Sequence, residues 1–352
     1  MTIDQARLEA FVGKMVVDMG AAMSAPLVRL GDRLGLYKQM AGAGPLSSEQ
    51  LAERSGVLER YVREWLNAQA ASGYIEFDPA TERYTLGDEA AMVLADERSP
   101  VFMGGAFDIM SAAFADQDKL LDAFRHGRGL GWHEHDKCLF SGTERFFRSG
   151  YNAHLVPDWI PAIEGAREKL EAGARVADVG CGFGASTIVM AKAWPNSRFV
   201  GFDYHEPSIV AARERAAEAG VGDRVDFQVA GAKDYPGRGY DLVAFFDCLH
   251  DMGDPVGAAR HVRESIADDG IWMLVEPFAN DSVADNLNPV GRIYYSASTM
   301  ICTPCSLAQE VGLGLGAQAG ERRLREVATE GGFGRFHRAT ETPFNLVFEA
   351  RA

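Results

Sequence analysis

A short acidic and glycine-rich segment carries the clearest chemical pattern in this sequence. Asp178 precedes three glycines at alternate positions, Gly180, Gly182 and Gly184, and a second acid, Asp203, follows further along the chain. Glycine lets the backbone turn sharply and approach a ligand closely. We therefore expect a ligand-binding turn after a buried strand, with Asp203 at a position that reaches ribose hydroxyls in such sheets.

The position of Asp178 helps to choose between two kinds of ligand. Gly180, Gly182 and Ala185 also fit the spacing of a dinucleotide-binding fingerprint, so a dehydrogenase is an alternative. A carboxylate two residues before the first glycine would be poorly placed beside a pyrophosphate. It would be well placed near a cofactor that carries ammonium and sulfonium charges, so the charge favours S-adenosylmethionine.

The elements that must position this turn are short apolar runs alternating with helical stretches. Five strands are predicted, namely Arg175–Val179, Arg198–Asp203, Arg224–Val229, Asp241–Phe246 and Ile271–Val275, with a helix beginning near Ala185. This alternation is typical of a parallel sheet covered by helices on both faces. The predicted fold class is α/β, with a Rossmann-like sheet.

The order of these motifs resembles that of class I S-adenosylmethionine-dependent methyltransferases. The resemblance rests on Asp178-x-Gly180-x-Gly182-x-Gly184, then Asp203, then Tyr240-Asp241-Leu242-Val243, and it covers residues 145–350. It implies that S-adenosylmethionine is the cofactor and that a small molecule accepts the methyl group.

The resemblance also implies which residues bind the cofactor. Asp178 and the glycines would line its methionine part, Asp203 would hold the ribose, and Ala232 with Lys233 would border the adenine. Gly231 stands where many relatives place an aspartate for the adenine amino group, so backbone amides are the alternative adenine contact. The full expected set is Tyr151, Asp178, Gly180, Gly182, Gly184, Asp203, Tyr204, Ala232, Lys233 and Phe246.

A histidine after the fourth predicted strand is the candidate base. His250-Asp251-x-x-Asp254 resembles the His-Asp-Trp-Ser-Asp segment of plant-type O-methyltransferases, whose histidine is catalytic. The resemblance implies that His250 takes the acceptor proton, as an imidazole with a pKa of about 6.5 can do. Glu276 occupies the place of an acid that orients this histidine. The alternative is that His250 caps its loop and Glu276 binds backbone amides.

Two further groups of residues are expected near the acceptor. Arg292, Tyr295, Ser298 and Thr299 follow the fifth strand, at the edge where open α/β sheets bind ligands, and we expect them to form the acceptor wall. Tyr151 matches a lid tyrosine that reaches the cofactor carboxylate in related enzymes. Aromatic packing is the alternative role of Tyr151.

The N-terminal part predicts a winged helix. Ser47 and Gln50 have the spacing of a capping box, which opens a helix that ends near Gly56, and residues 58–71 form a second helix. Strands at Tyr74–Phe77 and Arg83–Leu86 follow. A winged helix before a methyltransferase resembles dimeric small-molecule O-methyltransferases of plants and actinobacteria.

Two apolar series precede this winged helix. Residues 4–19 place Leu8, Phe11 and Met15 on one helical stripe, and Leu27, Leu30 and Leu34 continue as a second series. We expect two helices that bury these stripes against the rest of the domain or another subunit. A homodimer through the N-terminal helices is the predicted assembly.

The charge of the chain bears on its partners. The formal net charge is -15, and the segment Pro45–Ala90 contains four arginines and no lysine against nine acidic residues. Phosphate binding needs the opposite sign, so we expect no nucleic-acid partner. We also expect no membrane association and a cytoplasmic location, because no basic segment with an apolar run and cleavage site opens the chain, and no stretch approaches a membrane-spanning length.

The cysteines and two histidines could bind metal. Cys302 and Cys305 form the only CxxC pair, and His133 and His135 lie near Cys138. No second cysteine pair accompanies the first, so ordinary packing is the expected role and no metal site is predicted. A polar loop beside a pocket is the corresponding expectation for the histidines.

These patterns divide the chain into three expected regions. They are a winged-helix and dimerisation domain at 1–99, a helical linker and lid at 100–165, and a methyltransferase domain at 166–352. The predicted function is methyl transfer from S-adenosylmethionine to a hydroxyl, phenolic in the first instance. N- or C-methylation and an S-adenosylmethionine-sensing transcriptional regulator are the alternatives.

Overall fold

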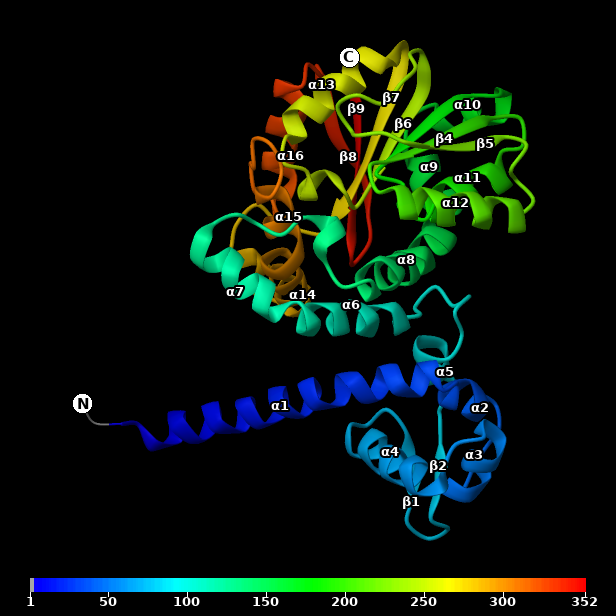
Figure 1. The fold of residues 1–352 in the computed structure, drawn as a ribbon, viewed down its shortest axis with the longest axis vertical. Coiled ribbons are helices and arrows are strands. Elements are labelled where there is room, and N and C mark those ends of the chain that lie inside the picture. The colour runs from blue at the N-terminus through cyan, green and yellow to red at the C-terminus, as the bar shows by residue number, and fades with distance from the viewer. Residues whose placement is uncertain (1–2) are drawn as a thin grey trace. The chain divides into compact units, whose positions relative to one another are not determined.

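The computed structural model describes residues 3–352, which form two compact units (Figure 1). The first contains the chain up to Ala112 together with Ser141–Ser149, and the second contains Ala113–Phe140 and Gly150–Ala352. The segment Ser141–Ser149 is held to the rest of the first unit by Arg145. Its guanidinium forms ion pairs of 2.8 Å with Asp32 and 2.9 Å with Asp108.

The N-terminal helix is a single element where the sequence predicted two. Helix α1 (Gln5–Arg33) begins at the N-cap Asp4 and continues past Pro26. Proline removes one helical hydrogen bond, but the following turn packs closely against helix α4 (Glu59–Ala71). The Trp65 indole donates a 2.9 Å hydrogen bond to the Leu27 carbonyl. This packing supports the helix beyond the proline.

The winged helix is confirmed. Helix α3 (Ser48–Ser55) has the predicted capping box at Ser47 and Gln50, and Gly56 ends it with a φ of 67°. Strands β1 (Glu76–Asp78) and β2 (Arg83–Thr85) pair antiparallel, with Phe77 opposite Tyr84. The other helices before the main sheet are α2 (Leu36–Met40), α5 (Asp88–Leu94), α6 (Gly104–Ala115), α7 (Gln117–His126), η1 (Trp132–Glu134), α8 (Cys138–Gly150), η2 (Tyr151–Trp159), α9 (Ile160–Ala162) and α10 (Ala166–Ala172).

The second unit is built on a seven-stranded sheet in the order β5-β4-β3-β6-β7-β9-β8. The five predicted strands are confirmed and pair parallel. Two antiparallel strands at the C-terminal end of the chain were not predicted. The strands are β3 (Arg175–Val179), β4 (Arg198–Asp203), β5 (Val225–Val229), β6 (Tyr240–Phe246), β7 (Ile266–Pro277), β8 (Arg335–Glu341) and β9 (Asn345–Arg351).

Helices cover this sheet, as expected for an α/β fold. Figure 1 shows α11 and α12 beside the β4 and β5 half, and α13 and α16 beside the half that contains β7 to β9. The parallel strands bring their carboxyl ends to one edge, where ligands bind in such sheets. The helices are α11 (Ala185–Ala193), α12 (Glu206–Glu218), η3 (Leu249–Asp251), α13 (Pro255–Ser265), η4 (Ala284–Asn286), α14 (Pro289–Ala297), η5 (Ser298–Cys302), α15 (Thr303–Leu307) and α16 (Gly320–Glu330).

Helix α1 corrects the expectation that no segment has a membrane-spanning length and composition. The helix contains 29 residues, and an 18-residue window is apolar enough to cross a membrane by composition alone. Alanine, methionine, valine and glycine make this window apolar without forming an unbroken run of large side chains. Core helices and signal sequences meet the same criteria, so this is weak evidence for a membrane.

Candidate active site

The glycine-rich turn after β3 has the conformation that its sequence predicts. Gly180 and Gly184 have φ angles of 75° and 76°, which favour glycine. A Cβ on Gly180 would lie 2.7 Å from Cys248 Sγ, and one on Gly184 would lie 2.5 Å from the Phe227 ring. Larger residues would therefore displace the end of β6 or the core beneath the turn.

Asp178 is buried below this turn and is only partly satisfied. Its Oδ2 accepts hydrogen bonds of 2.6 Å from both Ser186 Oγ and Thr187 Oγ1. Its Oδ1 is buried and has no hydrogen-bond partner among residues 3–352. Burial raises the pKa of Asp178 to about 6, and the two hydroxyl donors oppose this rise. The open carboxylate oxygen fits the ammonium group of an amino-acid moiety.

Asp203 ends β4 beside the same turn. Its Oδ2 accepts a 3.0 Å hydrogen bond from the Gly182 amide, and its Oδ1 accepts one of 2.9 Å from the His205 amide. Burial raises the pKa of Asp203. Each carboxylate oxygen has a second lone pair, so a ribose hydroxyl can still bind. Neighbouring Tyr204 is 48% exposed, at the rim of this position.

The residues predicted to border the adenine lie after β5. The Gly231 amide donates a 2.9 Å hydrogen bond to Asp234 Oδ1, which closes the loop. Lys233 Nζ forms ion pairs of 3.2 Å with both Asp254 and Glu310. The ammonium of Lys233 is therefore held by two acidic side chains.

Asp247, which sequence reasoning missed, lies directly after β6. It has a φ of 51° and is partly buried, and its Oδ2 accepts a 3.2 Å hydrogen bond from the Tyr151 hydroxyl. Its Oδ1 accepts one of 2.8 Å from Asn345 Nδ2. Burial, together with the charge of Glu276, raises the pKa of Asp247 well above its usual value. The signal available in the sequence was an acidic residue directly after the apolar run that ends at Phe246.

Tyr151 is the first residue of η2, and its side chain contacts two residues at the end of β6. Its ring lies 5.4 Å from that of Phe246 and 6.1 Å from that of Trp159, measured between centroids. Both the hydrogen bond to Asp247 and the aromatic packing are therefore present. To bind a cofactor carboxylate, the Tyr151 hydroxyl would have to exchange its partner.

His250 is buried between two carboxylates. Its Nδ1 donates a 2.6 Å hydrogen bond to Glu276 Oε2, and its Nε2 lies 3.2 Å from Asp251 Oδ1. The Leu249 amide also donates to Glu276 Oε1, at 3.0 Å. Both sequence-based interpretations of Glu276 therefore describe real contacts. Burial opposes a charged imidazole, but Asp251 and Glu276 overcome it and raise the pKa of His250 well above its usual value.

The four residues predicted to form the acceptor wall differ in their exposure. Arg292 and Thr299 are exposed, and the Thr299 hydroxyl donates to the Tyr295 carbonyl one turn earlier. Ser298 is buried, and its Oγ accepts a 3.1 Å hydrogen bond from the Ala317 amide. Tyr295 is half-buried. Within this group, Ser298 lies deepest.

The cysteine and histidine pairs take separate places. Cys302 and Cys305 are both buried free thiols, and Cys302 approaches His250 and Asp251. His135 Nδ1 forms a 2.9 Å contact with Asp116 Oδ2, which also binds the Asp136 amide. Burial lowers the pKa of His135. His133 packs at the ring of Tyr204.

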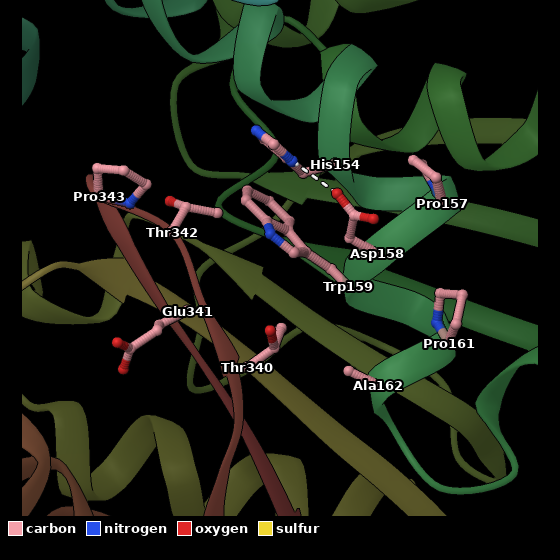
Figure 2. A pocket seen from close by; sticks show the side chains of 10 residues that line it. All are labelled: His154, Pro157, Asp158, Trp159, Pro161, Ala162, Thr340, Glu341, Thr342 and Pro343. Carbon is pink, nitrogen blue, oxygen red and sulfur yellow. Dashed lines mark hydrogen bonds and ion pairs between the residues drawn. The ribbon is translucent and has the colours of Figure 1, made fainter.

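A cavity of about 510 Å³ lies between η2 and the β8–β9 turn, lined by His154, Pro157, Asp158, Trp159, Pro161, Ala162, Thr340, Glu341, Thr342 and Pro343 (Figure 2). Figure 2 shows Trp159 among these side chains, with the His154–Asp158 pair joined by a 2.7 Å contact. None of the predicted site residues lines it. Its formation by segments far apart in sequence explains why it was not predicted.

Comparison with protein families agrees with this architecture. The model of Rv2258c-like winged HTH domains matches residues 22–96, and the model of a methyltransferase domain matches residues 170–331. The chain therefore combines an N-terminal winged-helix domain with a methyltransferase domain of the class I fold. The cofactor of this enzyme class is S-adenosylmethionine, and the unpartnered Oδ1 of Asp178 fits the ammonium group of that cofactor.

Among known proteins, the chain is similar to 27-O-demethylrifamycin SV methyltransferase of Amycolatopsis mediterranei. The two are 30% identical over 131 residues, which are 35% of this chain and 48% of that protein. The matched segments span between 6% and 48% of the first three curated relatives.

Solved structures resemble the chain over nearly its whole length. Human N-acetylserotonin methyltransferase, solved with S-adenosylmethionine, has a TM-score of 0.71 at 16% identity, covering 100% of this chain and 99% of that one. An O-methyltransferase from neocarzinostatin biosynthesis, solved with S-adenosylmethionine and 2-hydroxy-5-methyl naphthoic acid, has a TM-score of 0.61 at 18% identity, covering 94% and 96%. At these identities the likeness shows the fold.

Proposed function

We propose that this methyltransferase methylates a hydroxyl group, phenolic in the first instance, on a small molecule, with His250 as the general base. The observation that carries the proposal is the 2.6 Å hydrogen bond from His250 Nδ1 to Glu276. It fixes the imidazole and directs Nε2 away from Glu276, as a base acting on an acceptor requires. O-methyltransferases among the structural neighbours, including the mitomycin 7-O-methyltransferase, support the choice of oxygen.

The chain's residues have separate tasks in this proposal. S-adenosylmethionine, when bound, supplies a methyl group on a sulfonium, and Asp178 holds its ammonium while Asp203 holds its ribose. His250 Nε2 would take the hydroxyl proton as the acceptor oxygen receives the methyl group, and the sulfonium would leave as a neutral thioether. Glu276 stabilises the resulting imidazolium. The products are a methyl ether and S-adenosylhomocysteine.

Asp251 adjusts the proton affinity of this base. Its carboxylate favours the protonated imidazole, which cannot accept another proton, so transfer needs a pH at which His250 is neutral. A cationic cofactor beside His250 would oppose imidazolium formation and lower that pKa. We therefore expect activity to rise with pH across the neutral range.

The test combines acceptor discovery with one substitution. Wild type and His250→Ala are incubated with methyl-labelled S-adenosylmethionine and a panel of phenols, alcohols and amines, after equal binding of S-adenosylhomocysteine has been established. We expect label on a hydroxyl acceptor and a loss of about 100-fold or more in the variant, the range of general-base catalysis. Equal transfer by both proteins would contradict the base assignment, and label confined to amines would favour N-methylation.

We also propose that the chain forms a homodimer through α1. Large apolar side chains on this helix remain exposed, including Phe11 at 61%, Val16 at 63% and Met19 at 62%. Exposed apolar stripes of this size are typical of interaction surfaces. Sedimentation analysis should give a dimer for wild type and a monomer for the double variant Phe11→Glu/Val16→Glu. A monomeric wild type would contradict the proposal.

The winged helix offers little support for nucleic-acid binding. On α4, Arg60 pairs with Glu64 at 2.5 Å and Arg63 pairs with Glu59 at 2.6 Å. These arginines therefore already have acidic partners on their own helix. Binding of genomic DNA at low salt, lost as salt increases, would support the regulator alternative instead.

A further inference from the structure

Three different metal-binding atoms converge beside the candidate base. They belong to His250, Asp251 and Cys302, each of which offers one ligand atom, and these atoms all lie within 4.8 Å of one another. His250 and Asp251 belong to η3, after β6, whereas Cys302 ends η5 about 50 residues later in the chain. The fold therefore assembles this cluster from separate segments. His250 and Cys302 are buried, and Asp251 is partly buried.

We propose that these three atoms form a binding site for Zn²⁺. A nitrogen, an oxygen and a sulfur ligand are the types that zinc combines in proteins, at about 2.0–2.3 Å from the metal. Tetrahedral ligands at those distances are roughly 3.3–3.8 Å apart. The 3.2 Å between His250 Nε2 and Asp251 Oδ1 already approaches this spacing. The remaining separations would need to close by roughly 1 Å at most.

The orientation of Asp251 is a second observation that points to a ligand. Its Oδ1 is buried and makes no hydrogen bond within the described part of the chain, although His250 Nε2 is 3.2 Å away. The two atoms are thus close without the alignment of a hydrogen bond. A cation held between them would give this carboxylate oxygen a direct partner in place of the misaligned contact with His250.

Glu276 supplies the outer contact that metal-binding histidines usually have. The His250 Nδ1–H donates to Glu276 Oε2, so the lone pair of the neutral ring is on Nε2, which faces Asp251 and Cys302. A carboxylate–histidine pair of this kind orients the ring and increases its basicity as a ligand. One thiolate and one carboxylate would balance the two positive charges of the metal.

Cys305 provides an internal control for this site. It is a buried free thiol one helical turn after Cys302 and does not belong to the three-residue cluster. Its Sγ lies 3.6 Å from Gln309 Nε2. The two cysteines of the CxxC pair are therefore predicted to differ, and only Cys302 is a ligand.

Zinc bound at this site would change the role of His250. A metal bound to Nε2 uses the lone pair that the general base needs, so zinc and proton transfer exclude each other at this atom. Only this consequence rests on the proposed function. Zinc at this site would inhibit methyl transfer, and a chelator would restore it.

The test measures binding without cofactor or acceptor, so its failure is distinguishable from failure of the methyl-transfer proposal. Metal-free full-length protein is titrated with Co²⁺ under anaerobic conditions, and absorbance reports thiolate-to-cobalt charge transfer and tetrahedral coordination. We expect one Co²⁺ per chain with both signals, displaced by one Zn²⁺. Cys302→Ser should lose the charge-transfer band, whereas Cys305→Ser should keep it.

A second variant protects the test against a folding defect. Asp251→Asn retains the shape of the side chain and both cysteines, and it should weaken Co²⁺ binding at least about tenfold while keeping the thiolate band at saturation. Circular dichroism checks the fold of each variant. Absence of a thiolate band in wild type, or its persistence in folded Cys302→Ser, would overturn the proposal. Unchanged affinity in Asp251→Asn would remove that ligand and overturn the three-residue site.

Discussion

The candidate site has a cofactor side, around Asp178 and Asp203, and an acceptor side, around His250 and Glu276. The two sides use buried carboxylates in different ways. Asp178 is supported by two hydroxyl groups and keeps one oxygen without a partner, open to a cation from outside. Glu276 instead binds His250 and the Leu249 amide from within the protein. The first side is prepared to bind a charge, and the second is prepared to position a base. Replacing a carboxylate by an amide should therefore lower cofactor affinity on the first side and the maximal rate on the second.

The largest effect on the cofactor side is expected for Asp178→Asn. The amide keeps the shape of the side chain but removes the charge that pairs with the ammonium group. A hydrogen-bonded charge contributes about 1.5–3 kcal/mol, so affinity for S-adenosylhomocysteine should fall about 10- to 100-fold. Calorimetric titration measures this loss, with exposed Asp226→Asn as the matched control. Unchanged affinity in Asp178→Asn would remove Asp178 from the cofactor site.

The pH dependence of cofactor binding also tests whether Asp178 pairs with the ammonium group. Asp178 has a pKa of about 6, so its carboxylate becomes protonated and loses its attraction for the ammonium group below that pH. Affinity of wild type should therefore decrease as pH falls through about 6. Asp178→Asn should lack this component. A wild-type affinity that stays constant between pH 7 and about 5 would contradict the assignment.

The matching change on the acceptor side is Glu276→Gln. It leaves an oxygen for the Leu249 amide but removes the charge that stabilises the imidazolium. The maximal rate should fall about tenfold or more, because a hydrogen bond to a charged group is lost in the transition state. Binding of S-adenosylhomocysteine should stay within about twofold. If affinity falls while the maximal rate is unchanged, the two sides are not separate.

The smallest change lies in the winged helix and should leave both sides intact. Ser47→Ala removes the 3.3 Å hydrogen bond from the Gln50 amide at the start of α3. Loss of such a cap costs about 1 kcal/mol of stability. Urea unfolding followed by circular dichroism measures this loss. Cofactor affinity should be unchanged, and a large decrease would indicate coupling that this account does not include.

The cofactor side could be predicted because its determinants are local in sequence. Asp178, Gly180 and Gly184 need only a strand, a turn with positive φ and a helix start, and the structure has all three. The capping box at Ser47 and Gln50 is local for the same reason. At these positions the residue type itself indicates the backbone conformation, because glycine favours positive φ and serine favours the start of a helix.

The acceptor side depends on contacts that no local pattern records. Cys302 reaches His250, and Asn345 reaches Asp247, across 52 and 98 positions of the chain. Strand β8 escaped prediction because its alternating residues are mostly polar, and Phe336 is its one buried residue. Helix α1 was predicted as two helices because the packing of Trp65 against its last turns is also a long-range contact.

In the proposed reaction, His250 acts as a base whose proton affinity is set by Asp251. The most direct measurement is the pH dependence of kcat/KM for the acceptor, with saturating cofactor and a chelator, in wild type and Asp251→Asn. We predict that kcat/KM increases with pH through one ionisation, and that Asp251→Asn shifts this limb about one pH unit lower, because the charge that favours the imidazolium is gone. An identical limb in both proteins, or a rate that does not change with pH, would contradict the account.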